Sequence, residues 1–225
     1  MTPPSGYPIQ FQLKDRLCAV VGGGRVGLRK INGLRRAGAR VRLVTAVATA
    51  QLFARPDIEI IPRPYREGDL AGAFLAFAAT DDPRVNAAVA EEARRLNIPV
   101  NIADDPEGSD FLLPATFFRG DLAIAVTTGG RSPALAAQVR DHLAALIGPE
   151  WETVLEIAAA LRQKRLTLPE KAEYNQEILR RLIKEGLPAL ISGGNAGEVE
   201  GLLDRLLGKG FSLADLGIHL PKGMP

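Results

Sequence analysis

The sequence predicts an α/β protein in which a doubly wound parallel sheet is followed by a helical region. Three observations support this fold class. Apolar runs of strand length alternate with stretches of helical spacing in the first part of the chain, a glycine-rich turn follows the first run, and helical patterns alone follow Pro133. The 225 residues correspond to about one and a half domains, so we expect one full core and a smaller appendage.

The first run, Leu17 to Val21, is typical of a strand buried on both faces of a parallel sheet. Arg25 to Ala37 follows with helical spacing and ends at Gly38, a residue that accepts the positive φ found after helices. Val41 to Val44 predicts the second strand. These elements form a strand–helix–strand unit, which should have a right-handed crossover.

Three further apolar runs predict the remaining strands of the sheet. They are Ile58 to Ile61, Phe74 to Ala79 and Pro99 to Ala103, with a helix expected at Val85 to Leu96. The stretch from Asp104 to Gly120 is expected to be irregular, and Leu122 to Thr127 is one more strand candidate.

The chain beyond Pro133 is expected to be helical. The predicted helices are Pro133 to Leu146, Glu150 to Arg165, Pro169 to Lys184 and Glu198 to Leu207. Ser132 before Pro133 fits a cap residue followed by proline at the first helical position. The segment from Ser192 to Gly197 is expected to be a loop, and the tail from Lys209 to Pro225 to be irregular.

The composition excludes several classes of protein. With 46% apolar and 24% charged residues the chain is not expected to be disordered, and no apolar run approaches the ~20 residues that cross a bilayer. The net charge of +2 is too balanced to indicate nucleic acid. One cysteine, Cys18, and two histidines exclude a zinc site built from these residue types alone. We expect a cytoplasmic protein with no metal site and no nucleic-acid or membrane partner.

The turn after the first strand carries the motif G-x-G-x-x-G as Gly22, Gly24 and Gly27, with Arg25 and Val26 between the last two. The first glycine allows the tight turn, the second lets the backbone approach a pyrophosphate, and the third lets the helix pack on its strand. Amide groups at the helix start would hold the phosphates. The position between strand and helix favours a Rossmann-like dinucleotide site over a structural turn that binds nothing.

A second set of cofactor contacts is expected at the end of the second strand. The candidates are Thr45, Ala46 and Val47. The stretch from Leu43 to Ala46, where NAD-binding domains usually carry an acidic ribose ligand, contains no carboxylate. Arg40 and Arg42 lie nearby and offer the alternative of NADP, whose 2′-phosphate they would bind. Because arginines in such positions are more often solvated, NAD is favoured.

Acidic residues follow two other predicted strands. Thr80 and Asp81 are expected to line the cofactor crevice, whereas Asp82 fits better as the N-cap of the following helix. Asp104 follows the strand from Pro99 to Ala103, so its carboxylate also reaches the crevice and suits a general base. The alternative for Asp104 is a turn aspartate close to a proline.

Several segments, in this order and spacing, together resemble one family. They are Tyr7 to Ile9 with Asp15 and Arg16, Val21 to Gly27 with Arg29 and Lys30, Ala78 to Asp82 with Val85 and Asn86, Asn101 to Pro106, Phe111 to Ala115 and Thr128 to Pro133. The family is that of the precorrin-2 dehydrogenases, the N-terminal module of siroheme synthases. The resemblance covers about residues 7 to 150, and the part after Trp151 resembles the family only in being helical.

The resemblance implies oxidation of precorrin-2 to sirohydrochlorin with NAD as the hydride acceptor and, in some members, insertion of ferrous iron. It also implies a homodimer, with residues 1–113 as the NAD-binding domain, 114–150 as a dimerisation segment and 151–225 as a helical C-terminal domain with an irregular tail. The alternative is a nucleotide-sensing Rossmann module that regulates a partner protein. That alternative does not explain the matches after Asn101 and Thr128.

The resemblance also assigns roles to individual residues. Catalysis falls to Asp104, while the neighbouring Asp105 departs from the small apolar residue expected there, so it stays open which carboxylate faces the tetrapyrrole. Candidate substrate contacts are Asn101, Thr128, Gly129, Arg131 and Ser132. Amides of the glycine loop could hold substrate carboxylates, although Ser132 is equally explained as a helix cap.

Overall fold

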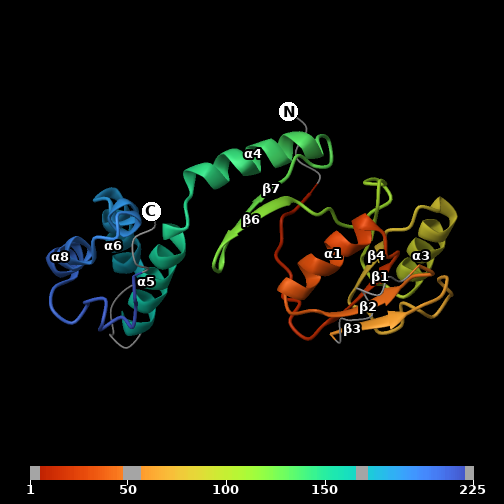
Figure 1. The fold of residues 1–225 in the computed structure, drawn as a ribbon, viewed down its shortest axis with the longest axis horizontal. Coiled ribbons are helices and arrows are strands. Elements are labelled where there is room, and N and C mark those ends of the chain that lie inside the picture. Colours follow the sequence, from red (N-terminus) through yellow and green to blue (C-terminus); the bar gives the residue numbers. More distant parts are fainter. Residues whose placement is uncertain (1–5, 48–56, 166–171, 221–225) are drawn as a thin grey trace. The chain divides into compact units, whose positions relative to one another are not determined.

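A computed structural model describes residues 6–47, 57–165 and 172–220 of the chain. These residues divide into two units, each described by itself. The first unit extends to Leu113 and includes Gly129–Arg131, and the second comprises Pro114–Thr128 and the chain from Ser132 onward. Figure 1 shows the sheet with α1 and α3 in the first unit and the helices α4 to α8 in the second. The three domain boundaries expected above stay predictions.

The first unit is built on a five-stranded parallel sheet. Its strands are β1 (Leu17–Val21), β2 (Arg40–Val44), β3 (Ile58–Ile61), β4 (Leu75–Ala78) and β5 (Val100–Ile102). Their order is β3-β2-β1-β4-β5, and neighbouring strands pair in parallel. The five predicted strands are therefore confirmed, with boundaries within about one residue. The strand order reverses between β1 and β4, the place where open α/β sheets bind ligands.

Helices cover both faces of this sheet (Figure 1). They are α1 (Arg25–Arg36) and α3 (Pro83–Arg95). Cys18 and Val20 of β1 belong to the same apolar cluster as Ile31 of α1, whereas Ala19 and Val21 belong to the cluster of α3. Alternate side chains of β1 thus pack against opposite helices, and this burial on both faces explains why the sequence of β1 is a continuous apolar run.

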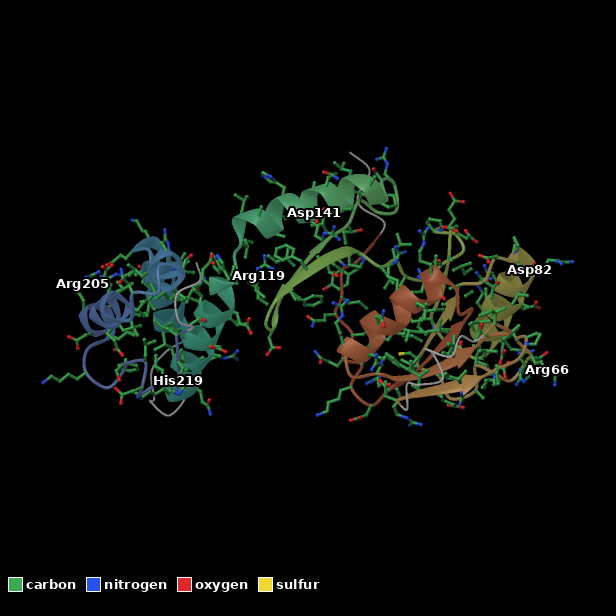
Figure 2. The ribbon with its side chains drawn as sticks, viewed as in Figure 1. Arg66, Asp82, Arg119, Asp141, Arg205 and His219 are labelled. Carbon is green, nitrogen blue, oxygen red and sulfur yellow. The ribbon has the colours of Figure 1, made fainter. Side chains whose placement is uncertain are left out.

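The expectation of an irregular stretch from Asp104 to Gly120 is wrong. Ala115–Arg119 forms β6, which pairs antiparallel with β7 (Leu122–Val126) in a separate two-stranded sheet. Both strands alternate half-buried and exposed residues, so β6 lacks the long apolar run that marks a buried strand. Arg119 (Figure 2) donates from Nε to the Ile147 carbonyl at 2.9 Å, which fastens the hairpin to the end of α4 (Pro133–Leu146).

Four helices complete the second unit. They are α5 (Glu150–Arg165), α6 (Ala172–Lys184), α7 (Leu187–Ser192) and α8 (Ala196–Leu207). The helix α7 was not predicted, and α8 begins two residues earlier than expected, so the predicted loop from Ser192 to Gly197 is too long. The predicted start of α6 at Pro169 lies outside the described residues.

The tail after α8 is irregular as far as Leu220, in agreement with the prediction, and its last residues lie outside the described part. Leu213 and Ile218 of this tail are nonetheless buried, in the same cluster as Leu182 and Leu203 of the helices. The tail therefore closes the core of the helical bundle. Among the described residues, none of the helices combines the length and apolar character needed to cross a membrane.

Candidate dinucleotide and catalytic site

The glycine turn after β1 is fixed by close packing at its first and third glycines. Gly22 has φ +110°, and a Cβ there would lie 2.2 Å from the Ala79 carbonyl oxygen. A Cβ on Gly27 would lie 1.9 Å from the Gly22 carbonyl oxygen. At Gly24, in contrast, a Cβ would meet nothing within 4 Å. The second glycine thus faces open space, as a turn that receives a pyrophosphate requires.

The start of α1 is open to an anion. Its N-cap is Gly24, which supplies no side-chain hydrogen bond, and the first turn contains no acidic residue. The first helical bond runs from the Leu28 amide to the Gly24 carbonyl at 2.9 Å. The amides of Arg25 and Val26 consequently have no partner within the helix. These amides form the positive end of the helix dipole, which suits the negatively charged phosphates of a dinucleotide.

The end of β2 adjoins this turn. A Cβ on Gly23 would lie 2.7 Å from Thr45 Oγ1, and Thr45 itself is buried. The Thr45 hydroxyl accepts the Val47 amide at 3.2 Å and closes a short turn that leaves Ala46 and Val47 exposed. Of the predicted cofactor residues, these three lie at the carboxyl edge of the sheet beside the glycine turn.

The end of β4 is held by Asn86, a residue of the family resemblance to which the sequence analysis assigns no role. The Thr80 amide and hydroxyl donate to Asn86 Oδ1 at 3.1 and 2.7 Å, and Asn86 Nδ2 donates to the Thr80 carbonyl at 3.0 Å. Asn86 is buried on α3, and an asparagine on the inner face of a predicted helix was the available signal.

The acidic residues beside Thr80 have different environments. Asp81 is exposed at the same edge of the sheet. Asp82 caps α3, as predicted, by accepting the Arg84 amide at 2.9 Å. Its side-chain hydrogen bond with the Arg84 guanidinium lowers the pKa of the Asp82 carboxyl, which favours the charged cap.

The two carboxylates after β5 also differ. Asp105 Oδ1 accepts the Gly108 amide at 2.9 Å and so shapes the turn. Asp104 is exposed, has φ +61°, and makes no hydrogen bond or ion pair with another described residue. Left-handed backbone is uncommon outside glycine, and aspartate is among the residues that tolerate it. The structure thus leaves the Asp104 carboxylate available to a ligand.

Asn101 lies beneath this turn and is buried. Its Nδ2 donates to the Phe111 carbonyl at 2.9 Å, and its Oδ1 accepts a hydrogen bond from Lys30 Nζ. Both ends of the amide are therefore engaged inside the first unit. Its predicted contact with substrate stays a prediction, as do the roles of the other site residues.

The second glycine loop is held by its flanking side chains. The Thr128 hydroxyl accepts the Ser132 amide and donates to the Ser132 carbonyl, both at 3.0 Å. Ser132 Oγ accepts the Leu135 amide at 3.2 Å and caps α4. Gly129 has φ +62°, and Arg131 is exposed without a hydrogen bond or ion pair to another described residue.

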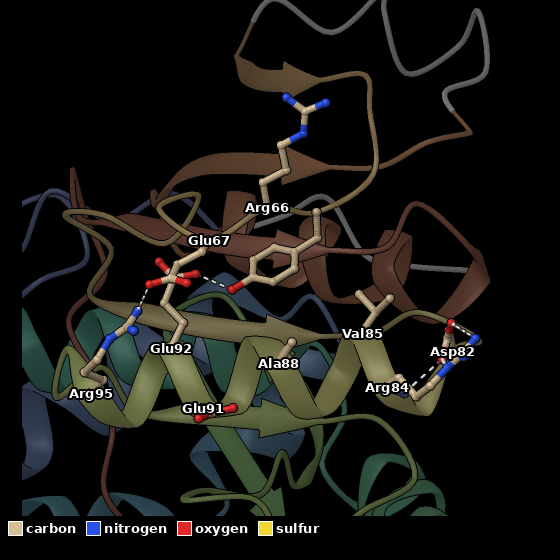
Figure 3. A pocket seen from close by; sticks show the side chains of 10 residues that line it. Arg66, Glu67, Asp82, Arg84, Val85, Ala88, Glu91, Glu92 and Arg95 are labelled. Atoms are coloured by element: carbon tan, nitrogen blue, oxygen red, sulfur yellow. Dashed lines mark hydrogen bonds and ion pairs between the residues drawn. The ribbon is translucent and has the colours of Figure 1, made fainter.

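A separate hollow of about 530 Å³ lies between α3 and the segment of residues 65–67 (Figure 3). Its polar groups are largely paired, since the buried Glu92 accepts from the Tyr65 hydroxyl and the Gly68 amide, and Arg95 contacts Glu67 at 2.7 Å. None of the predicted site residues lines this hollow. Within the described ranges, no group of three or more His, Cys, Asp or Glu side chains could hold a metal ion.

The open glycine turn at the reversal point of a parallel sheet defines a dinucleotide-binding protein of the Rossmann class. Residues 9–115 match a family model described as "Putative NAD(P)-binding", and residues 119–146 match one described as "Sirohaem biosynthesis protein central". The chain is 34% identical over 214 residues to the siroheme synthase of Thioalkalivibrio sulfidiphilus, covering 94% of this chain and 44% of that protein. It is 42% identical over 167 residues to that of Methylococcus capsulatus, covering 72% and 35%. The chain is thus similar to the part of the siroheme synthases that these matches cover.

This chain spans less than half the length of the curated relatives it matches. Its fold is similar to the solved structure titled "SirC, precorrin-2 dehydrogenase", with a TM-score of 0.71, 24% identity, and coverage of 89% of this chain and 98% of that chain. The predicted fold class and the resemblance to siroheme synthases are thereby confirmed, and the family model supports a nicotinamide dinucleotide as the cofactor. The choice of NAD over NADP stays a prediction. The comparisons give no support to the alternative of a regulatory nucleotide-sensing module.

Proposed function

We propose that this protein is an NAD-dependent enzyme of siroheme biosynthesis that dehydrogenates precorrin-2 to sirohydrochlorin. The observation that carries the proposal is the pairing, in one unit, of an open dinucleotide turn after β1 with the unpartnered Asp104 carboxylate after β5. The family supports the pathway, and the printed name of the similar solved structure supports the reaction.

The reaction removes a hydride and a proton from the reduced tetrapyrrole, and NAD, when bound, would supply the hydride acceptor. The protein groups orient the reactants. Amides at the start of α1 hold the pyrophosphate, and Asn86 fixes Thr80 at the crevice. The Asp104 carboxylate then takes the proton, a role worth roughly 10²- to 10⁴-fold in rate for a well-placed base.

The tetrapyrrole carries several carboxylates, and the loop Gly129–Arg131 suits them. A Cβ on Gly130 would lie 3.5 Å from Pro106 Cβ, so this loop adjoins the turn that carries Asp104. The Arg131 guanidinium and the loop amides bind substrate carboxylates, while Thr128 and Ser132 hold the loop in shape.

The test of the reaction is Asp104→Asn, because asparagine tolerates the left-handed backbone but is a poor base. We expect sirohydrochlorin formation, followed by absorbance under anaerobic conditions, to fall at least about 100-fold while NAD binding persists. The matched control is Asp105→Asn, which affects the turn and should keep turnover within a few-fold. Normal turnover by Asp104→Asn would remove Asp104 from the mechanism. Insertion of ferrous iron stays a prediction.

The partner proposed for this chain is a second copy of itself. One face of α4 packs on the β6–β7 hairpin, and the other exposes Leu135, Val139 and Leu146 at 55%, 39% and 65%. An exposed apolar stripe at helical spacing is typical of an interface. Light scattering should give a dimer mass for the intact chain and a monomer for Val139→Glu. The cytoplasmic location stays a prediction.

A further inference from the structure

A buried lysine lies beneath the crevice. Lys30, on the inner face of α1, is only 9% exposed. Its Nζ donates to Asn101 Oδ1 and lies 5.4 Å from the centre of the Phe77 ring. Within the described residues it forms no ion pair with a carboxylate. A buried ammonium group whose one hydrogen-bond partner is neutral lowers the stability of the fold, because no opposite charge offsets its desolvation.

The charges around Lys30 leave this ammonium poorly compensated. Burial is the largest influence and lowers the pKa of Lys30 to about 8, and Arg29 on the same helix lowers it further. Asp104, beyond β5, acts in the opposite direction. The groups packed against Nζ from β4 and β5, Phe77 and Asn101, are neutral. The charge of Lys30 is therefore sensitive to any further charge that enters nearby.

The position of Lys30 in the fold indicates whether it would lie near the adenosine half or the nicotinamide half of a dinucleotide. In a Rossmann domain the adenosine ribose lies over the end of the second strand, which here is the turn at Thr45. A nicotinamide half bound across the reversal point would then face the other side of the sheet, where β4 and β5 lie. Lys30 contacts both of these strands and lies within electrostatic range of Asp104.

We propose that Lys30 discriminates between the redox states of the bound dinucleotide, because its ammonium group disfavours the positively charged oxidised nicotinamide relative to the neutral reduced ring. This inference rests on the proposed function. The protonated Lys30 favours hydride acceptance, since acceptance removes the like charge from the ring. Asn101 is the positioning residue that holds this ammonium in place.

The experiment compares the dissociation constants of NAD⁺ and NADH, by calorimetry and by NADH fluorescence, without substrate. Lys30→Met replaces the ammonium group with a neutral side chain of similar length. In this variant we expect the dissociation constant of NAD⁺ divided by that of NADH to fall about tenfold at pH 6.5. This is the effect of removing one of two like charges roughly 10 Å apart. The matched control is Arg29→Met, which removes the same charge from an exposed position of the same turn. Screening by water should keep its ratio within about twofold of the wild type. Lys30→Arg should retain the wild-type ratio.

The pH dependence gives a second measurement on the wild type. The ammonium is present below the pKa of about 8, so the preference for NADH should be strong at pH 6.5 and fade as the pH rises through that value. In Lys30→Met the ratio should not change over this range. An unchanged ratio in Lys30→Met, or one that changes equally in Arg29→Met, would overturn the inference alone. Failure of the folded wild type to bind either dinucleotide would overturn the proposed function as well.

Discussion

Two glycine-rich loops in this chain lead into helices, and the two helix ends differ in what they leave free. The first loop ends at Gly24, which caps α1 without a side chain. The second ends at Ser132, whose Oγ accepts the Leu135 amide at 3.2 Å at the start of α4. The first helix end is open to an external anion, whereas the second is closed by a residue of the chain itself.

The difference shows that glycine content alone does not identify an anion site. The residue at the N-cap decides whether the amides of the first turn are available. At the second loop these amides are partly satisfied by Ser132, so carboxylates of a substrate are left to Arg131 and to the loop amides before it. Three predictions test this contrast.

The largest effect is expected for Gly27→Ala. Its Cβ would lie 1.9 Å from the Gly22 carbonyl oxygen, so either the turn or α1 must shift. We expect dinucleotide affinity to fall more than about 100-fold and stability to fall by several kcal/mol. Calorimetry with NADH and urea unfolding measure the two effects.

The matched control in the second loop is Gly129→Ala. Gly129 has φ +62° but open space around its Cβ position, so alanine costs about 1 kcal/mol through backbone strain. Dinucleotide affinity should remain within about twofold. Equal losses of affinity in the two variants would show that the glycine turn after β1 has no special role.

The second prediction converts the open helix end into a closed one. Gly24→Asp has room for its side chain, and the carboxylate would accept a first-turn amide as Ser132 Oγ does in α4. We expect stability to rise by a few tenths of a kcal/mol and dinucleotide affinity to fall about 100-fold, because a negative charge occupies the phosphate position.

Gly24→Asn separates the two causes, since it adds a cap without a charge and should reduce affinity only about tenfold. Both variants should be at least as stable as the wild type in urea unfolding. Unchanged affinity in Gly24→Asp would place the phosphates elsewhere on the protein.

The same local rules explain what the sequence could predict. The strands of the sheet are recognisable because residues such as Cys18 and Ala19 are buried on opposite faces, which produces a continuous apolar run. The motif formed by Gly22, Gly24 and Gly27 is recognisable in the sequence because its glycines stand close together in the chain, and the contact of Gly27 with the Gly22 carbonyl lies within the motif itself. The strand β6 was missed because it buries only part of one side.

The remaining features depend on contacts between distant parts of the chain. Lys30 and Asn101 lie 71 positions apart, and nothing in the local pattern of either residue indicates that they meet. The different environments of Asp104 and Asp105 likewise depend on the folded turn, in which Asp105 is hydrogen-bonded to Gly108 and Asp104 is not. Local spacing predicts turns and caps, whereas buried polar pairs require the tertiary structure.

The smallest effect is expected for Ser132→Ala, which opens the second helix end. Loss of the bond to the Leu135 amide should lower the free energy of unfolding by about 1 kcal/mol and shift the urea midpoint with an unchanged slope. Ser132→Thr keeps an acceptor at the cap and should restore most of the stability. The start of α4 is not part of the glycine turn after β1. The affinity for NADH should therefore stay within about twofold of the wild type in both variants. A large fall in NADH affinity in Ser132→Ala would mean that the two helix ends do not act separately, and the contrast between them would fail.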